Sequence, residues 1–333
     1  MVEEIRPGIF RITVPLPDHP LKTVNSYVIA SGERSLLVDT GWNRSDCVEA
    51  LLDGLDAIGI KRCRTDLFLT HIHADHAGLT DLFSSQRAKI FCGQADIDNI
   101  DHFINTGSDR SWQSLKALAA PHGFSAAELE AAIEAHSGNR YKPFQRPSLS
   151  PVTGQDRLVV GKYTLTCIAT PGHTLGHTCL YDPARKIFFS GDCLLGQLFP
   201  TLSQWSLTDR NLAYYLEWLE RAAAYPVELV LPGHWDEFSN FHSRLKATLA
   251  YQRQRNAEIT ALLASGSKRL NACQVAAAIS WNQKHNQWIF FPIARKWSAV
   301  ADTLAHLCYL RDQGLLSMHT NQAEVTWSLA RQE

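Results

Sequence analysis

The chain has 333 residues and a net charge of -1 with histidine neutral, and 45% of its residues are hydrophobic and 20% charged. This composition is ordinary for a globular protein and excludes a largely disordered chain. The length exceeds the usual size of one hydrophobic core, so we expect either one large domain with an appendage or two domains.

The N-terminal residues MVEEIRPGIF begin acidic and lack the basic and apolar regions of a secretory signal. No run reaches the roughly 18 apolar residues that a membrane span requires. We therefore expect a cytoplasmic protein without membrane contact. Its eight cysteines form no C-x-x-C pair, and we expect them to be reduced.

The first part of the chain alternates short apolar runs with one periodic stretch. Runs bounded by Gly, Pro, Asp or Ser predict strands at residues 9–14, 25–30, 35–40, 65–70 and 88–92. Apolar residues at helical spacing predict a helix over 45–58. The segment 94–150 differs, with helices predicted at 112–120 and 125–136 and a loop after them, and we interpret it as a helical insertion.

Strands return in the next part of the chain, at residues 163–169, 178–181, 186–190 and 228–231, with a helix at 209–224. The order of strands, helices, strands and helices predicts an α+β fold, in which two layers of sheet have helices outside them.

The last part of the chain has a different character. A long amphipathic helix begins near 243, helices follow at 272–279 and 300–313, and two strand-like runs flank a turn at 320–322. Three helices and a hairpin are the order of a small winged-helix domain. Residues 241–333 hold 11 Lys and Arg against 5 Asp and Glu, whereas residues 1–240 hold 21 against 28. This predicts a domain boundary near residue 240, and the basic surplus indicates either a contact with a polyanion or a solvated face.

The segment THIHADHAG, residues 70–78, places three histidines and an aspartate within six residues where a predicted strand ends. Such a group is costly to bury without a compensating charge. Residues two apart in an extended chain point to the same side, so His71 and His73 can hold one ion together. Asp75 and His76 follow where the chain turns, and they can face a second ion. A separation of about 3.5–4 Å would let one water bridge the two ions.

Further candidate ligands follow other strands in short loops that contain glycine. These are His173 in TPGHT, Asp192 in SGDC and His234 in LPGHW, together with Asp39 in VDTG. All four lie at predicted strand ends, where a rigid sheet can hold several loops in register.

The order V-D-T-G, H-x-H-x-D-H, P-G-H-T, G-D and P-G-H resembles the metallo-β-lactamase fold superfamily over residues 9–234. The resemblance implies an αββα sandwich with a dinuclear metal site at one edge, here followed by the winged-helix domain. It also implies a role for each motif residue: one metal on His71, His73 and His173, the second on Asp75, His76 and His234, Asp192 between them, and Asp39 behind the ligands, holding the histidine loop.

Two positions narrow the resemblance. Asp192 stands where antibiotic-cleaving lactamases often carry Cys, and His73 stands where flavodiiron oxidoreductases have Glu. The ligand set resembles the branch of glyoxalase II, ribonuclease Z and lactonases, which hydrolyse esters, thioesters and phosphodiesters. The winged helix together with SGDCLLG resembles the subgroup of the animal β-lactamase-like endoribonuclease.

Imidazole and carboxylate ligands without thiolate favour Zn²⁺, with Fe²⁺ and Mn²⁺ as alternatives. Two such ions lower the pKa of a bridging water, and the resulting hydroxide is the predicted nucleophile. Asp75 has a second predicted role, in orienting the hydroxide and passing a proton to the leaving group. The sequence has no G-x-S-x-G elbow that would supply a side-chain nucleophile.

The predicted reaction is the hydrolysis of an ester, thioester or lactone of a small molecule by this dinuclear centre. One alternative is a metal-dependent endoribonuclease or phosphodiesterase that holds RNA through Arg295, Lys296 and Arg311. Because helix 300–313 has few basic side chains, we favour a C-terminal domain that packs on the catalytic domain or forms a homodimer. The other alternative is a mononuclear iron sulfur-dioxygenase of the same fold.

The insertion and the loop 194–205 both leave strands that carry ligand motifs, so we expect them to overhang the metals. Their aromatic residues either form an apolar wall for the substrate or pack the insertion onto the body: Trp112, Tyr141, Phe199 and Trp205. Two further residues lie beside ligands, and we predict supporting or packing roles for both: His177 and Cys193.

Overall fold

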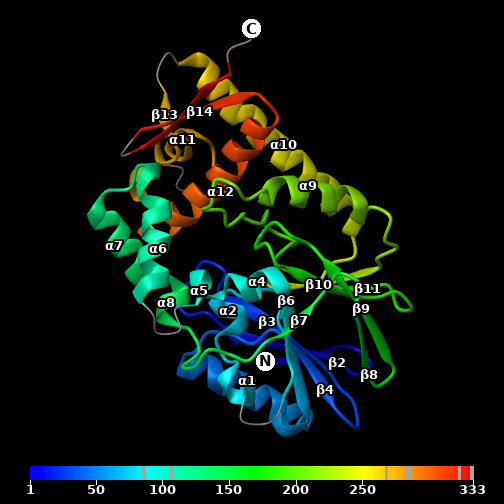
Figure 1. Ribbon diagram of the computed structural model, residues 1–333. Coiled ribbons are helices and arrows are strands. Elements are labelled where there is room, and N and C mark those ends of the chain that lie inside the picture. The colour runs from blue at the N-terminus through cyan, green and yellow to red at the C-terminus, as the bar shows by residue number, and fades with distance from the viewer. Residues whose placement is uncertain (85–87, 105–108, 267–268, 282–286, 322–323, 331–333) are drawn as a thin grey trace.

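The computed structural model describes residues 1–84, 88–104, 109–266, 269–281, 287–321 and 324–330 (Figure 1). Its first sheet has seven strands that are neighbours in chain order: β1 (Val2–Arg6), β2 (Ile9–Pro15), β3 (Thr23–Ile29), β4 (Ser35–Val38), β5 (Thr65–Phe68), β6 (Ile90–Gly93) and β7 (Ser150–Val152). Strands β1 to β4 pair antiparallel, whereas β4 to β7 are parallel. The parallel strands therefore end at one common edge.

The second sheet has five strands in the order β12-β11-β10-β9-β8. Their bounds are β8 (Arg157–Val160), β9 (Tyr163–Ala169), β10 (Thr178–Asp182), β11 (Ile187–Gly191) and β12 (Leu229–Pro232). Apolar side chains from both sheets form one core between them, including Val38 and Phe68 from the first sheet and Phe189 and Leu231 from the second. The two sheets are thus packed face to face.

Helices cover the outer faces of this sandwich. Helix α1 (Ser45–Ile58) packs Leu51 and Leu55 into a core with Ile12 of the first sheet. Helix α9 (Asn211–Ala222) and the start of α10 (Phe241–Ser265) pack against the second sheet, where Trp218 and Phe241 are almost fully buried. The layers are therefore helix, sheet, sheet and helix.

Several short helices lie between β5 and β7. They are α2 (Ala74–Ala77), α3 (Asp81–Ser84), α4 (Gln94–Asp98), α5 (Ile100–Phe103), α6 (Asp109–Ala119), α7 (Ala126–Ala135) and α8 (Ser137–Arg140). Three 3-10 turns complete the helical elements: Arg62–Arg64, Ala120–His122 and Trp288–Phe290. Helix α7 begins with a capping box, in which Ser125 and Glu128 satisfy each other's backbone N–H groups.

The C-terminal segment contains α10, α11 (Ala272–Ala278) and α12 (Ile293–Asp312), with a small sheet in the order β13-β15-β14. Its strands are β13 (Leu270–Asn271), β14 (Leu316–Thr320) and β15 (Val325–Leu329). These elements share a further apolar core with the insertion, the C-terminal core, since α7 contacts α12 and α6 contacts α7 (Figure 1). Trp112 and Leu129 of the insertion contact this core, as do Trp297, Leu304 and Trp327.

The predicted elements agree with the structure to different degrees. The predicted bounds of α1 and β9 are those observed, but β1, β7 and β8 were not predicted. The segment predicted as a loop after α7 contains α8, and α12 begins at Ile293 rather than at residue 300. The predicted turn at 320–322 lies partly outside the described residues. None of the helices in the described ranges combines the length and apolar character needed to cross a membrane.

Candidate metal centre

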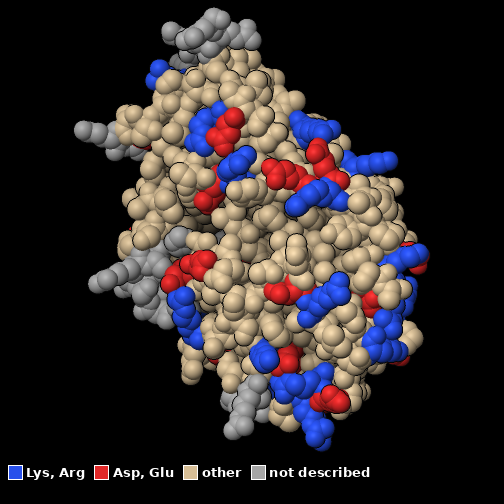
Figure 2. Space-filling view, turned by 45° about the vertical axis from the view of Figure 1, so that its right-hand side comes forward, with Lys and Arg blue, Asp and Glu red and all other residues tan. Residues whose placement is uncertain are grey.

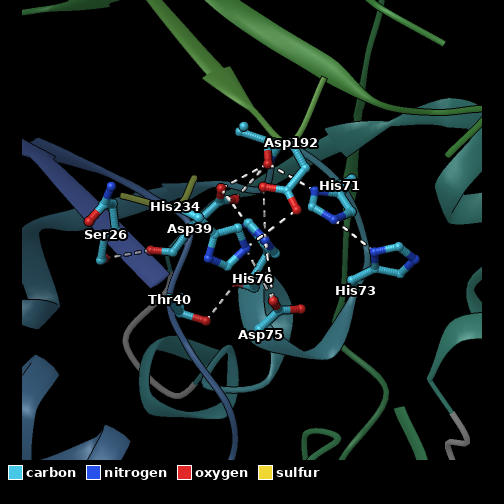
Figure 3. Close-up of polar contacts among 12 residues, drawn as sticks. Ser26, Asp39, Thr40, His71, His73, Asp75, His76, Asp192 and His234 are labelled. Atoms are coloured by element: carbon cyan, nitrogen blue, oxygen red, sulfur yellow. Dashed lines mark hydrogen bonds and ion pairs between the residues drawn. The ribbon is translucent and has the colours of Figure 1, made fainter. Parts of the chain in front are cut away.

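The seven predicted ligand side chains converge on the sandwich edge where four strands end. Figure 3 shows them apart from His173, which it does not label. Strand β5 ends just before the histidine-rich segment, and β9 ends just before the loop that carries His173. Strand β11 ends at Gly191, next to Asp192, and β12 ends at Pro232, close to His234. The ligands therefore come from four loops held by two packed sheets.

The local conformation of the histidine-rich segment separates its ligands into two groups. His73 is the N-cap of α2, with extended backbone, so His71 and His73 precede the helix. Asp75 and His76 lie in the helix itself. The change from extended chain to helix therefore lets one short segment face two points, as its spacing predicted.

The first group consists of three histidines. His73 Nδ1 lies 3.0 Å from His71 Nε2 and 3.0 Å from His173 Nε2. All three ligand atoms lie within 4.8 Å of one another. One ion placed among these nitrogens would have three imidazole ligands.

The second group consists of Asp75, His76 and His234. Asp75 Oδ2 lies 3.5 Å from His234 Nε2 and 3.7 Å from His76 Nε2. Asp192 lies between the two groups, because its Oδ2 is 3.4 Å from His234 Nε2 and 3.8 Å from His173 Nε2. Its Oδ1 is 3.6 Å from His76 Nε2.

Unpaired polar atoms provide a test of whether this donor set fits cations. His76 Nε2, His234 Nε2 and Asp192 Oδ1 are buried, and the described residues offer none of them a hydrogen-bond partner. Buried polar atoms without partners are costly, and a cation would satisfy all three. Tetrahedral bonds of about 2.0–2.1 Å place neighbouring donors about 3.3 Å apart. The observed separations of 3.0–3.8 Å are of this size, so the residues fit two divalent cations.

The outer nitrogens of four histidines are held by oxygen atoms. His71 Nδ1 lies 3.1 Å from Thr70 Oγ1, and His76 Nδ1 lies 2.8 Å from Asp39 Oδ2. His173 Nδ1 lies 2.7 Å from the carbonyl oxygen of Thr201, and His234 Nδ1 lies 2.6 Å from that of Thr23. A proton donated from Nδ1 leaves the Nε2 lone pair free to bind a metal. The carboxylate oxygen and the two carbonyl oxygens can only accept a hydrogen bond. They therefore fix the tautomer of His76, His173 and His234 with the proton on Nδ1.

Asp39 lies directly behind His76, at the place that the resemblance implies. Its Oδ2 accepts hydrogen bonds from His76 Nδ1 and Thr70 Oγ1, and its Oδ1 accepts one from Thr70 N, each at 2.8 Å. Its backbone is left-handed, with φ of 59°, and its carbonyl accepts a hydrogen bond from Ser26 Oγ at 2.6 Å. These bonds hold an uncommon backbone conformation that turns the carboxylate toward the ligand loop.

The histidines of the cluster differ in the direction in which their pKa values are shifted. Burial, and then the neighbouring imidazoles, hold the pKa of His71 well below its usual value. Burial also lowers the pKa of His76, but Asp39 and the other nearby carboxylates outweigh it and raise that pKa to about 9. Burial opposes ionisation of Asp192, yet His234 and His76 bring its pKa well below the usual range. We therefore expect metal binding to displace protons from the imidazoles that balance these carboxylates.

Asp96 was not predicted, although it connects two ligand loops. Its buried carboxylate accepts hydrogen bonds from Ile72 N at 3.1 Å, Thr174 Oγ1 at 2.8 Å and Gly176 N at 2.7 Å. Burial raises the pKa of Asp96 to about 6, although these hydrogen bonds act in the opposite direction. The available signal was its position just after β6, a strand that ends at the edge of the site.

His177 and Cys193 lie behind Asp192. His177 Nε2 accepts a hydrogen bond from Asp192 N at 3.1 Å, and its Nδ1 lies 2.6 Å from Thr170 Oγ1. Cys193 is fully buried, with its sulfur 3.2 Å from that of Cys179. Both ring nitrogens of His177 are therefore engaged, and His177 supports the backbone of the shared aspartate.

The four aromatic residues predicted to overhang the site all have ring partners. The pairs are Trp112 with His136 at 4.9 Å, Tyr141 with Trp42 at 4.2 Å, Phe199 with Tyr251 at 4.2 Å, and Trp205 with Trp297 at 4.1 Å between ring centroids. Of the two predicted roles, these contacts favour packing of the insertion and loop onto the rest of the molecule over an apolar wall for the substrate. The insertion packs mainly on the C-terminal helices, because its apolar face is complementary to α12.

Comparison with known proteins agrees with this geometry. The sequence profile of the metallo-beta-lactamase superfamily matches residues 19–234. The probable metallo-hydrolase YqjP of Bacillus subtilis (strain 168) is 25% identical over 286 residues, which cover 80% of this chain and 83% of that protein. The acyl-coenzyme A thioesterase MBLAC2 of Bos taurus is 27% identical over 227 residues, which cover 64% and 74% of the two chains.

Two solved structures are similar over nearly the whole chain, including the C-terminal segment. The metallo-beta-lactamase family protein TTHA1429 from Thermus thermophilus has a TM-score of 0.81 and 25% identity, and covers 98% of this chain and 100% of that chain. A beta-lactamase domain protein from Burkholderia ambifaria, with a TM-score of 0.82 and 20% identity, shares the fold over 99% and 94%. The profile match, the fold and the converging motif residues together show that this chain belongs to the metallo-β-lactamase superfamily of hydrolases.

Proposed function

We propose that this chain is a metal-dependent hydrolase that uses two divalent cations to cleave an ester, thioester or lactone of a small molecule. The observation that carries the proposal is the pair of adjoining donor groups, His71 with His73 and His173, and Asp75 with His76 and His234. Asp192 lies within 3.8 Å of donors in both groups and is the proposed shared ligand.

The proposed mechanism gives separate roles to the cations, to Asp75 and to Asp39. When bound, the two cations supply a hydroxide nucleophile at neutral pH and polarise the bond to be cleaved. The side chain of Asp75 is 13% exposed, whereas those of His76 and His234 are fully buried, so Asp75 faces the open side of the cluster. We assign to Asp75 the orientation of the attacking water and the transfer of a proton to the leaving group. Asp39 keeps His76 in the metal-binding tautomer.

The proposed cations are zinc ions. The donor set is made of imidazoles and carboxylates, and no thiolate is among the seven side chains. This set favours Zn²⁺, and Fe²⁺ and Mn²⁺ are the alternatives that the ligand type leaves open.

The names of two relatives support a thioester as the first substrate to test. One is the acyl-coenzyme A thioesterase MBLAC2. The other is the atrochrysone carboxyl ACP thioesterase of Passalora fulva, 23% identical over 291 residues, which cover 84% of this chain and 69% of that protein. Both names describe thioester hydrolysis, which the proposed nucleophile can perform on a small acyl group.

The three cations predicted to hold RNA give that alternative little support. Lys296 Nζ lies 3.5 Å from Glu128, and Arg311 lies 2.7 Å from Asp312. Arg295 is half-buried, with its guanidinium 4.6 Å from the ring centroid of Phe291. On the face shown in Figure 2, the described basic and acidic groups are interspersed rather than gathered into a basic stripe. Recognition of a polyanion would require more unpaired cations.

We propose that residues 1–240 form the catalytic domain, with an insertion at about 94–150, and that residues 241–333 form a linker helix and a winged-helix unit. The three helices and the hairpin of α10 to β15 support this division. The C-terminal unit packs on α6 and α7 through the C-terminal core, which supports a role in the fold rather than in nucleic-acid binding.

Metal analysis followed by a substrate screen tests the proposal. We expect two zinc ions per chain and hydrolysis of a thioester, lactone or ester by the metal-loaded protein, with little dependence on salt. RNA cleavage that weakens steeply with ionic strength would instead support the endoribonuclease alternative. One iron ion per chain and no hydrolysis would support the sulfur-dioxygenase. Both results would contradict the proposal.

A further inference from the structure

A buried carboxylate of helix α12, that of Asp302, is bonded to a loop that contacts the proposed metal centre. Leu202 N donates a hydrogen bond of 2.8 Å to Asp302 Oδ1, although the two residues lie 100 positions apart in the chain. Asp302 is 3% exposed and Leu202 is fully buried. This bond therefore joins the C-terminal segment to the loop after β11 in the interior of the protein.

The residues on both sides of Leu202 hold the metal ligand His173. His173 Nδ1 donates a hydrogen bond of 2.7 Å to Thr201 O, and Ser203 N donates one of 3.1 Å to His173 O. The segment 201–203 thus contacts both the ring and the backbone of His173. A shift of this segment would turn His173 Nε2 away from its position 3.0 Å from His73 Nδ1.

Apolar contacts also join α12 to Leu202 of this segment and to Trp205, which lies just after it. Trp205 packs on Trp297 of α12, with ring centroids 4.1 Å apart, about one turn and a half before Asp302 along the helix. Leu202 also lies in a core with Ala305 of α12. The segment that orients His173 is therefore fixed to α12 by a hydrogen bond and by apolar contacts.

We propose that Asp302 is a positioning residue for the metal centre, which acts through Leu202 and the segment 201–203 to orient His173. The C-terminal segment then contributes to metal affinity without supplying a ligand. This inference rests on the proposed function, since it takes His173 as a ligand of the cation shared with His71 and His73. Residues that hold metal ligands in place typically change metal affinity about 10–100-fold when they are replaced.

The test is the zinc affinity of full-length variants, measured by competition with a chromophoric chelator. In Asp302→Asn the amide oxygen can still accept the hydrogen bond from Leu202 N, so both zinc ions should bind as in the wild type. In Asp302→Ala that acceptor is lost, so we expect one zinc ion to bind about 10-fold more weakly and the other to bind normally. If Asp302→Ala does not fold, Asp302→Leu replaces it in the test, because leucine removes the acceptor and still fills the volume. We expect the same weaker binding of one zinc ion in Asp302→Leu.

Thr303→Ala is the matched control. Thr303 is also buried in α12, but its hydroxyl donates to Ala299 O within the same helix. We expect this variant to lower the free energy of unfolding without changing zinc affinity. The cobalt-loaded proteins add a spectroscopic readout, because the visible bands of one ion should shift in Asp302→Ala and stay unchanged in Thr303→Ala.

The outcomes separate this inference from the proposed function. Two zinc ions bound with wild-type affinity by Asp302→Ala or Asp302→Leu would overturn the inference alone. Equal weakening of both ions in the Asp302 and Thr303 variants would also overturn it, because loss of stability would then explain the effect. A wild-type protein that binds neither zinc nor iron or manganese would overturn the proposed function and this inference together.

Discussion

Asp75 contacts the metal-site histidines and also faces the open side of the cluster, so its charge has two consequences. The variant Asp75→Asn keeps the shape of the side chain but loses the negative charge and the ability to take up a proton. We expect it to retain part of its metal and to lose about 10²-fold or more in kcat. Metal analysis and steady-state kinetics on the best substrate of the screen measure both effects.

The control for this variant is Asp53→Asn, because Asp53 is an exposed residue of α1. It should match the wild type in metal content and in kcat. Full activity of Asp75→Asn with normal metal content would remove Asp75 from the mechanism.

The residues that converge at the candidate metal centre could be singled out from the sequence because their signals are local. Each lies in a short motif directly after a predicted strand, and His71 and His73 lie two residues apart. Asp96 also follows a predicted strand but lies in no motif of the resemblance, and the sequence gives no signal for Asp302, because its partner is distant in the chain. Asp302 binds Leu202, 100 residues away, and the positions around Asp302 show no motif.

The short passage from β6 into α4 lies unusually close to the loop that follows His173. A Cβ atom on Gly93 would lie 1.9 Å from Gly176 O, which is backbone and has no other rotamer. We therefore expect Gly93→Ala to push the two segments apart and to lower the free energy of unfolding by about 1–3 kcal/mol. Urea unfolding at constant pH measures this change.

Gly32→Ala, between β3 and β4, is the matched control for Gly93→Ala, since a Cβ at Gly32 would meet no atom within 4 Å. Its free energy of unfolding should stay within about 0.5 kcal/mol of the wild type, as is usual for surface substitutions. Equal stability of the two alanine variants would show that the chain at Gly93 can move apart at no cost.

Elements with strong local patterns were predicted well, and those that depend on distant partners were not. Helix α1 is amphipathic and ends with Gly59 in a left-handed conformation, so both of its ends have local signals. Strand β1 reads VEEIR, of which Ile5 alone is buried, and β7 contains Pro151. Pairing with β2 and β6 stabilises these edge strands, and the sequence shows no periodicity that reveals it.

The start of α12 was placed too late for a different reason. From residue 299 to 308 its side chains are buried on every side of the helix, so the alternation of polar and apolar residues is weak. Its first turns follow Pro292, the N-cap residue, and include the charged pair Arg295 and Lys296. A helix buried on all sides shows little amphipathic pattern, and its ends are correspondingly hard to predict.

Three histidines outside the metal centre make the stability of the whole molecule depend on pH. Burial lowers the pKa of His122 and His136 to about 4 and that of His306 to about 3. In the unfolded chain the same rings titrate near about 6.5. The unfolded state therefore binds more protons below this pH, and stability is lost as the pH falls from about 6.5 toward 4. At pH 5 the loss is about 1–2 kcal/mol per ring.

Urea unfolding at pH 7 and pH 5 checks this prediction, with His306→Leu as the comparison. The variant lacks one ring that must gain a proton on unfolding, so its stability should fall less between the two pH values than that of the wild type. The residues of the candidate metal centre are the same in both proteins, and their contribution cancels in the difference. An identical decrease in both proteins would contradict the assignment to His306.

The C-terminal core also has a consequence for how the protein is made. Trp112 and Leu129 leave the ribosome long before Trp297 and Trp327, the residues that cover them. For most of the time in which the polypeptide is synthesised, the apolar side of α6 and α7 has no partner, and such surfaces invite aggregation. This surface is covered only when the last helices and strands have emerged.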